Sequence, residues 1–418
     1  MEKWLISVDD HLIEPPHVWL GRLQAHHQDS APRWIDDEHG GAWLFEGRRI
    51  PMDAMGTAGA IWPKEARPPM FHPLRWDQVH PACHDPKARV EAMNVHHEIA
   101  ALCFPNMPGF AGSLFQRAHD KDLALACIRA YNDWFFDEWV DAFPGRFIGL
   151  GLVPLWDARL AAEEAERVIA RGARSISFSQ APQALGFPPV HDKSWDPLFS
   201  VMNDAHLPLS THLGTGMTPA EESQAEDFTT RMREAMKNND LGSVAERMGI
   251  TGPDASPRRQ NMLPGASTSL IGARMGQATL NEWLESGNFV KYPHLRLALS
   301  ENGVGWMPSA LSLADWSETM LRLESPCEEP MPSQLFRDHV VGCFIHEPIT
   351  PELVAVVGAD NIMIETDFPH TATNWPYSME RALACMERLP EETQDRILRT
   401  NAENLFKFTP AEPPALVG

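Results

Sequence analysis

Eight short runs of apolar and β-branched residues recur along the chain, and segments with helical periodicity lie between several of them. Apolar residues in each run are continuous rather than alternating, which is typical of strands buried on both faces of a parallel sheet. Strands that alternate with helices in this number predict a (β/α)8 TIM barrel, with an open doubly wound sheet as the alternative. The predicted strands are 4–8, 98–104, 147–153, 174–178, 207–211, 295–300, 339–345 and 362–365.

Two long stretches do not fit a minimal barrel. Residues 20–84 follow the first strand and contain a predicted hairpin at 41–51. Residues 217–276 follow the fifth strand and combine charged, helix-like sequence with a stretch rich in Gly and Pro. Both connect a strand to a helix, so we expect both at the catalytic face, as lids or as contacts of a homodimer. No linker composition divides the chain, and we expect one domain over 1–418.

Charge and cysteine usage limit the partners and the compartment. The 418 residues include 35 Lys and Arg against 57 Asp and Glu, a net charge of -22. Such a surface repels phosphate backbones and anionic lipids, which argues against nucleic acid and membranes and leaves a small-molecule substrate. No apolar run reaches the ~20 residues that span a bilayer, and the N-terminus does not resemble a signal peptide. The six scattered cysteines predict reduced thiols in a cytoplasmic protein.

Side chains that can bind a metal follow four of the predicted strands, at the point where each strand ends. Asp9 and His11 follow the first strand, and their spacing of two points them to the same side. His212 ends the fifth strand, Glu301 the sixth and Asp367 the eighth. Because the carboxyl ends of barrel strands converge, we expect these residues to meet. Imidazoles combined with carboxylates suit one divalent ion, Zn²⁺ or Mn²⁺.

Further residues near the strand ends are candidates for supporting roles. His346 ends the seventh strand and is a candidate catalytic residue, with a solvent-facing side chain as the alternative. Glu14 is a candidate hydrogen-bond acceptor for a ligand histidine, or a cap of the next element. His370 lies in the turn after the eighth strand, where it contacts substrate or only the backbone. Trp306 is expected in the core or the pocket wall, and Arg337 is a candidate to bind an anionic substrate.

Six motifs, spread in order over most of the chain, resemble one family. They resemble the amidohydrolase-related branch of the amidohydrolase superfamily, which includes aminocarboxymuconate-semialdehyde decarboxylase and related decarboxylases and hydrolases. The resemblance runs from about Leu5 to Phe406 and weakens in 20–84 and 217–276. The motifs are VDDHLIEPPHVW, AYNDWFFDEW, PGRFIGLGLVP, STHLGTG, LSENGVGWMP and ETDFPHTATNWP.

This resemblance implies a (β/α)8 barrel with one divalent ion at the strand ends. The family's two strand 1 ligands fall on Asp9, where many relatives have His, and on His11. The strand 5 ligand falls on His212 and the strand 8 carboxylate on Asp367. The strand 4 end has no Lys to bridge a second ion. The main departure is Glu301, since many relatives carry at that position a His that assists the chemistry.

Metal-dependent hydrolysis is the leading hypothesis for the activity. The ion would lower the pKa of a bound water, Asp367 would take its proton, and Glu301 would serve as a second acid or base. The alternative is a lyase that removes CO2 from an aromatic or unsaturated carboxylate, with Arg48 and Arg49 as further anion-binding candidates or surface groups. A third hypothesis, from another class, is a barrel that binds a ligand without catalysis. The metal-competent positions argue against the third, and release of CO2 separates the second from the first.

Overall fold

A computed structural model describes residues 3–38, 40–51, 75–215, 266–370 and 372–414. Eight strands form one sheet in the order β1-β5-β6-β7-β8-β9-β10-β11, and the paired neighbours run parallel. The sheet closes where Asp367 N donates to Asp9 O at 2.8 Å and His11 N donates to Phe368 O at 2.7 Å. The predicted (β/α)8 barrel is therefore confirmed, in place of an open sheet. The strands are β1 (Leu5–His11), β5 (Glu98–Phe104), β6 (Phe147–Gly151), β7 (Ala173–Phe178), β8 (Pro208–His212), β9 (Arg296–Ser300), β10 (Val340–Phe344) and β11 (Ile362–Ile364).

The strands lie close to the predicted ranges, and the largest difference is at β1. This strand continues through Asp9 and Asp10 to His11, with every residue buried. The sequence prediction ended the strand at Val8, because charged residues seldom continue a buried strand. Here hydrogen bonds and clustering with other polar groups hold these three side chains inside the barrel.

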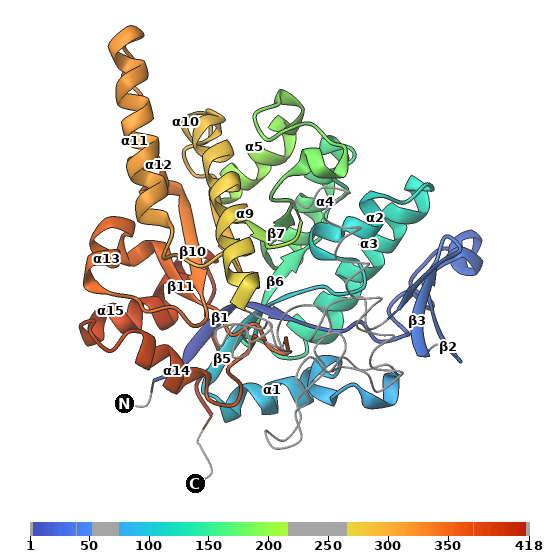
Figure 1. Ribbon diagram of the computed structural model, residues 1–418. Coiled ribbons are helices and arrows are strands. Elements are labelled where there is room, and N and C mark those ends of the chain that lie inside the picture. The colour runs from blue at the N-terminus through green and yellow to red at the C-terminus, as the bar shows by residue number, and fades with distance from the viewer. Residues whose placement is uncertain (1–2, 39, 52–74, 216–265, 371, 415–418) are drawn as a thin grey trace, which may run out of the picture.

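Helices surround the barrel, as Figure 1 shows. Helix α4 (Ala158–Ala170) begins as predicted, because Asp157 Oδ1 accepts hydrogen bonds from Arg159 N at 2.9 Å and Leu160 N at 3.2 Å. The other helices are α1 (Pro86–Val95), α2 (Ser113–Gln116), α3 (Lys121–Phe135), α5 (Asp196–Ala205), α9 (Ala266–Glu285), α10 (Asn288–Lys291), α11 (Met307–Glu324), α12 (Pro332–His339), α13 (Pro351–Val357), α14 (Ser378–Cys385), α15 (Glu391–Asp395) and α16 (Asn401–Leu405).

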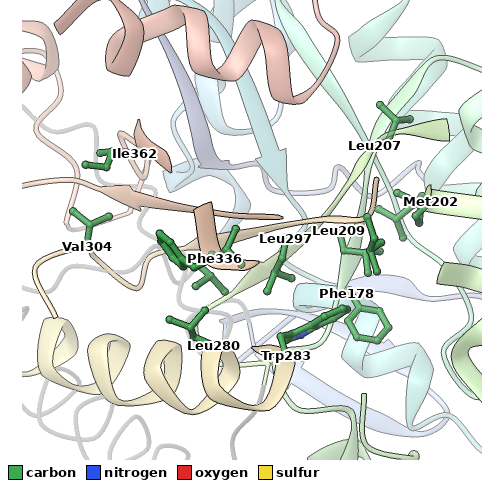
Figure 2. Close-up of a cluster of buried hydrophobic side chains, with 14 of the residues drawn as sticks. Phe178, Met202, Leu207, Leu209, Leu280, Trp283, Leu297, Val304, Phe336 and Ile362 are labelled. Atoms are coloured by element: carbon green, nitrogen blue, oxygen red, sulfur yellow. The ribbon is translucent and has the colours of Figure 1, made fainter. Parts of the chain in front are cut away.

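Helix α9 begins inside the stretch 217–276, which was predicted to be an insertion; residues 217–265 lie outside the described part of the chain. Glycines in this segment weaken the prediction of a helix, because glycine is unfavourable inside helices. A side chain at Gly272 would place its Cβ 2.6 Å from Glu301 O, and one at Gly276 would come within 2.8 Å of Asn302 Cβ. The glycines therefore let α9 lie directly against the end of β9. Figure 2 shows how Leu280 and Trp283 of this helix pack on the barrel.

Part of the stretch 20–84 forms a small antiparallel sheet beside the barrel, at the right of Figure 1. The predicted hairpin is present as β3 (Gly40–Phe45) and β4 (Arg48–Pro51). Strand β2 (Arg33–Asp37) was not predicted, because three of its five residues are charged and none is fully buried. The buried Trp43 anchors the sheet by edge-to-face contact with Trp19, whose ring centroid lies 5.0 Å away.

Candidate active site and metal centre

Three strand ends bring Asp9, His11, His212 and Asp367 together, and we call these four residues the ligand cluster. The first two lie at the end of β1, His212 ends β8, and Asp367 follows β11. His11 Nε2 lies 3.4 Å from Asp9 Oδ1, 3.1 Å from Asp367 Oδ1 and 3.2 Å from His212 Nε2. His212 Nε2 lies 3.3 Å from Asp9 Oδ2. All four side chains are buried.

The orientation of His212 suits metal binding. Its Nδ1–H donates to Leu213 O at 2.6 Å, which leaves the lone pair of Nε2 directed into the cluster. The rings of Phe104 and Phe110 hold the imidazole, with centroids 4.8 Å and 3.8 Å away. Phe110 also contacts His11, at 5.2 Å between centroids. Aromatic walls thus fix both rings before any ion binds.

The spacing and chemistry of the ligand cluster fit one divalent ion. Ligand atoms at about 2.1 Å from a common ion lie roughly 3.0–3.4 Å from one another, and the four distances above fall between 3.1 and 3.4 Å. Asp9, His11 and His212 form one group with metal-ligand spacing, and Asp367 joins this group through His11. Among the described residues, the carboxylate oxygens of Asp9 and Asp367 are approached by imidazole nitrogens, and none of these contacts has the geometry of a hydrogen bond. Buried carboxylates in that state are costly unless a cation neutralises them. Zn²⁺ and Mn²⁺ both suit this donor set, as the sequence predicted.

The electrostatics of the cluster also favour a cation. Burial raises the pKa of Asp9 well above its usual value, and the negative charges of Asp367 and Glu301 raise it further. Burial likewise raises the pKa of Glu365, with the charge of Asp9 as the next cause. Several carboxylates therefore oppose one another's ionisation in a small buried volume. A divalent ion would stabilise the ionised forms.

Glu301 follows β9 directly and lies beside the ligand cluster. Its Oε2 is 3.8 Å from His212 Nε2, and its backbone N–H donates to Glu365 Oε2 at 3.0 Å. Glu301 and Asp367 both adopt left-handed backbone conformations, with φ of 57° and 53°. Residues other than glycine seldom do so, and such strain is concentrated at functional sites. Burial, followed by the charge of Asp367, raises the pKa of Glu301 to about 7.

His370 lies closer to the ligand cluster than its position in a turn suggested. Its Nδ1 is 2.7 Å from Asp367 Oδ1, and its ring stacks on His11 with 3.6 Å between centroids. His11, Asp367 and His370 form a second group with metal-ligand spacing. His370 Nε2 has no hydrogen-bond partner among the described residues. The residue can therefore support Asp367 through one nitrogen and face a substrate with the other.

Two of the supporting residues act on the backbone. The Glu14 carboxylate accepts hydrogen bonds from Asn106 N at 3.0 Å and Met107 N at 2.8 Å. It thus fastens the loop after β5, as a capping group does, and does not receive a hydrogen bond from a ligand histidine. Trp306 Nε1 donates to Asn302 O at 2.9 Å, beside the start of α11.

His346 and Arg337 lie in other surroundings than the sequence predicted. The His346 imidazole is 2.7 Å from Ala372 O at Nε2 and 3.0 Å from Asn374 Nδ2 at Nδ1, so both ring nitrogens contact the segment after His370. These contacts hold the ring against that segment, and a catalytic role for His346 stays a prediction. Arg337 donates to Val356 O at 3.2 Å. It lies on α12, which leads into the N-terminal end of β10, away from the catalytic face of a barrel, and a contact with substrate stays a prediction.

Sequence analysis missed a buried network behind the ligand cluster. Asp10 Oδ1 accepts hydrogen bonds from Thr366 Oγ1 at 2.7 Å and Phe368 N at 3.3 Å, the two neighbours of Asp367. Asp10 Oδ2 faces the fully buried Arg89, whose Nη1 is 3.4 Å away and whose Nη2 donates to His11 O. Asp10 therefore ties β1 to the residues that carry Asp367. The only sequence signal was a second acidic residue between Asp9 and His11.

Replacement of Thr366 by valine should weaken metal binding without touching a ligand. The change keeps the shape of the side chain and removes the hydroxyl that bonds to Asp10. Because a lost supporting hydrogen bond loosens the ligand it positions, we expect metal affinity to fall by roughly 10-fold to 100-fold. Isothermal titration of the metal-free chain with Mn²⁺ measures the change.

Thr279→Val is the matched control for this variant. Thr279 is also buried, and its hydroxyl donates to Met275 O within α9 at 3.0 Å. Both variants lose a buried hydroxyl, so both lose stability, but only Thr366→Val should lose metal affinity. Equal affinity in the two variants would show that Asp10 does not position Asp367 through Thr366.

A cavity of about 590 Å³ opens beside the ligand cluster. Glu301 and His370 line one side of it, consistent with Glu301 lying at the barrel mouth. Two arginines, Arg48 of β4 and Arg117 after α2, line it as well. The apolar lining consists of Phe45, Ile50, Met107, Phe110, Leu114 and Ala118.

Comparison with known proteins agrees with this geometry. A family model described as amidohydrolase matches residues 36–408. The chain belongs to this family. It is therefore an amidohydrolase-family enzyme, and the resemblance found in its motifs is confirmed. In the part of the chain that the structure describes, no helix combines the length and apolarity needed to cross a membrane.

Several solved structures share the fold over nearly their whole length. An amidohydrolase from Mycobacterium avium subsp. paratuberculosis K-10 aligns with a TM-score of 0.67 and 21% identity, over 97% of this chain and 98% of that one. The 5-carboxyvanillate decarboxylase of Novosphingobium aromaticivorans, solved with manganese and 4-hydroxy-3-methoxy-5-nitrobenzoic acid, aligns at 0.60 and 19%, over 97% and 96%. The 2,6-dihydroxybenzoate decarboxylase from Rhizobium aligns at 0.58 and 17%, over 97% and 99%. At these identities the alignments show the fold.

Proposed function

We propose that this amidohydrolase-family enzyme is a metal-dependent, non-oxidative decarboxylase of an aromatic carboxylate. The composition of the cavity beside the ligand cluster carries the proposal. Its lining combines apolar and aromatic side chains with Arg48, Arg117 and the carboxyl groups of Glu301 and Glu46. A flat ring fits between apolar walls, a substrate anion is attracted by arginine, and a ring carbon that loses CO2 needs an acid to protonate it.

The chain's own residues divide this chemistry between them. Asp9, His11, His212 and Asp367 would hold the ion, which as a Lewis acid supplies an anchor for the substrate carboxylate and a neighbouring oxygen. Glu301 would donate its proton to the ring carbon as the bond from that carbon to the carboxylate breaks. The electron pair of the broken bond passes to the ring carbon and then into the new C–H bond. CO2 leaves, and solvent returns a proton to Glu301.

Solved structures with this fold support the choice of reaction class. The two decarboxylases described above act on hydroxylated benzoic acids according to their names, and one was solved with manganese. Glu301 stands where this family resemblance led us to expect a histidine. The proton-donating role would therefore pass to a carboxylic acid, and without an ion its pKa is about 7, well above that of an exposed glutamate.

Hydrolysis is a second candidate, because two carboxyl groups face the same small volume. The charge of Asp367 raises the pKa of Glu301, so one carboxyl group of the pair can be ionised while the other is protonated. In that reaction the pair would deprotonate water and then protonate a leaving group. Amides, esters, lactones and diketones that carry an anionic group would fit the cavity.

One assay separates the two candidates. The enzyme is loaded with Mn²⁺ or Zn²⁺ and incubated with hydroxylated benzoic acids, and released CO2 is measured together with the decarboxylated ring. The same preparation is tested against anionic amides, esters, lactones and diketones. We expect CO2 release from at least one hydroxylated benzoic acid. Hydrolysis without CO2 release would overturn the proposal in favour of the second candidate.

Arg48→Ala should weaken substrate binding more than it slows turnover. Arg48 lines the cavity, and a lost contact between arginine and a substrate carboxylate should raise KM by roughly 10-fold. Arg49→Ala is the control, because Arg49 Nη2 bonds to Asp37 at 2.9 Å and the side chain lies on the opposite face of β4. Steady-state kinetics on the best substrate gives both constants. An unchanged KM in Arg48→Ala would exclude Arg48 as the anion contact.

A further inference from the structure

Helix α11 extends away from the barrel, at the upper left of Figure 1. Its first turns are anchored, since Met307, Ala310 and Leu311 are buried. Beyond them the helix exposes five large apolar side chains, and four of these lie in one row, which we call the α11 stripe. Leu313 is 57% exposed, Trp316 62%, Met320 41% and Leu323 74%.

Spacing within the α11 stripe follows the pattern by which helices pair. The four residues lie three, four and three positions apart, as do the a and d positions of a heptad repeat. They therefore form one row along about 15 Å of helix. Monomeric proteins seldom expose such a continuous apolar row with a tryptophan in it. This row has the form of an interface with another helix.

The opposite face of α11 already contacts the protein itself. Asp315 Oδ1 accepts a hydrogen bond from Ser333 N of α12 at 2.8 Å. Arg322 Nη2 donates to Glu329 O at 2.7 Å, and its Nε pairs with Glu318. These contacts fix the rotation of the helix, so the α11 stripe points away from α12.

Charge beside the stripe permits contact with an identical surface. The flanking positions hold Ser312, Ser317 and Thr319, and only Glu324 at the C-terminal end is charged. In a chain with a net charge of -22, most surfaces would repel their own copy. An anionic membrane is a poor partner for this helix, because Arg322 is its only basic residue and pairs with Glu318.

We propose that the α11 stripe is the contact between two copies of this chain. The two α11 helices would pack side by side about a two-fold axis, so that each stripe covers the other. Trp316 would be the anchor of this contact, since a large aromatic side chain near the centre of an interface carries much of its binding energy. The α11 stripe would thus be the contact surface of the expected homodimer. This proposal does not depend on which reaction the enzyme catalyses.

Trp316→Glu and Leu323→Glu test the contact by placing a charge in the stripe. Light scattering coupled to size exclusion, repeated over a range of protein concentrations, gives the mass of the metal-loaded enzyme. We expect the wild-type chain to be dimeric and both variants to be monomeric. Because both side chains are largely exposed in one chain, the variants should fold, which far-UV circular dichroism checks.

Leu321→Glu is the matched control on the same helix. Leu321 is 64% exposed but lies roughly 120° around the helix from the centre of the stripe. This variant should remain dimeric. A wild-type chain that is monomeric at every concentration would overturn the proposal. A dimer that survives both stripe variants would also overturn it, because the contact would then lie elsewhere.

Discussion

Asp367→Asn is expected to abolish metal-dependent activity while leaving the chain folded. Asparagine keeps the size of the side chain but removes the charge and replaces one oxygen of a carboxylate that lies 3.1 Å from His11 Nε2. Metal-free Asp367 raises the pKa of Asp9 and Glu301, so the substitution relieves repulsion in the absence of an ion. The variant should therefore be at least as stable as the wild type in chelator.

Added metal should stabilise the wild-type chain against unfolding but not the Asp367→Asn variant. At an Mn²⁺ concentration of 100 times its Kd, the wild-type chain should gain about 2.7 kcal/mol of unfolding free energy. Asp367→Asn should gain almost none at the same concentration, and its kcat should fall by at least about 10³-fold, as expected when metal is lost. Urea unfolding with and without Mn²⁺ measures the first effect, steady-state kinetics measures the fall in kcat, and elemental analysis of the dialysed protein checks the loss of metal.

Asp338→Asn provides the control, since Asp338 is exposed on α12 and its loss changes the net charge by the same amount. It should keep both the stabilisation by Mn²⁺ and the activity. Stabilisation of Asp367→Asn by Mn²⁺ to the wild-type extent would contradict the assignment of Asp367 as a ligand.

The ligand cluster could be predicted because its signals are local. Asp9, His11, His212 and Asp367 each stand at or just beyond the end of an apolar run, and a closed parallel barrel brings all such ends to one side. The prediction therefore needed the fold class and the strand ends, and no knowledge of side-chain contacts. Glu301 followed from the same rule.

The residues that hold the cluster in place could not be predicted in the same way. Asp10 alternates with Asp9 and His11 along β1, so its side chain points away from the ion. Its function depends on Thr366 and Arg89, which approach from β11 and α1. Such contacts between distant segments leave no periodic pattern in a single sequence.

Arg337 and Arg48 differ in where they lie along the chain relative to the barrel strands. A residue on the helix before a strand lies near the N-terminal end of that strand, whereas the catalytic face contains the segments after the strands. Arg337 precedes β10, and Arg48 lies in the insertion after β1. The direction of the chain alone therefore favours Arg48 over Arg337 as a substrate contact. Arg48 lines the cavity, whereas Arg337 donates a hydrogen bond to Val356 O.

Glu301→Gln should keep the metal and the fold and still lose most of the activity. Glutamine retains the size of the side chain, and the backbone N–H bond to Glu365 does not depend on the side chain. The glutamine side chain cannot donate or accept the catalytic proton. Loss of a general acid or base reduces rates by about 10²–10⁴-fold, and we expect kcat to fall within this range while KM changes little.

Glu46→Gln is the control for loss of charge in the same cavity. Glu46 also lines the cavity, but its carboxylate accepts hydrogen bonds from His119 N and Asp120 N, each at 2.9 Å. It is thus engaged with the backbone, and its variant should keep kcat within a few-fold of the wild type. If Glu301→Gln with a full complement of metal were as active as Glu46→Gln, Glu301 would have only a structural role. Proton transfer would then have to be assigned to Asp367, or to His370 on the same side of the cavity.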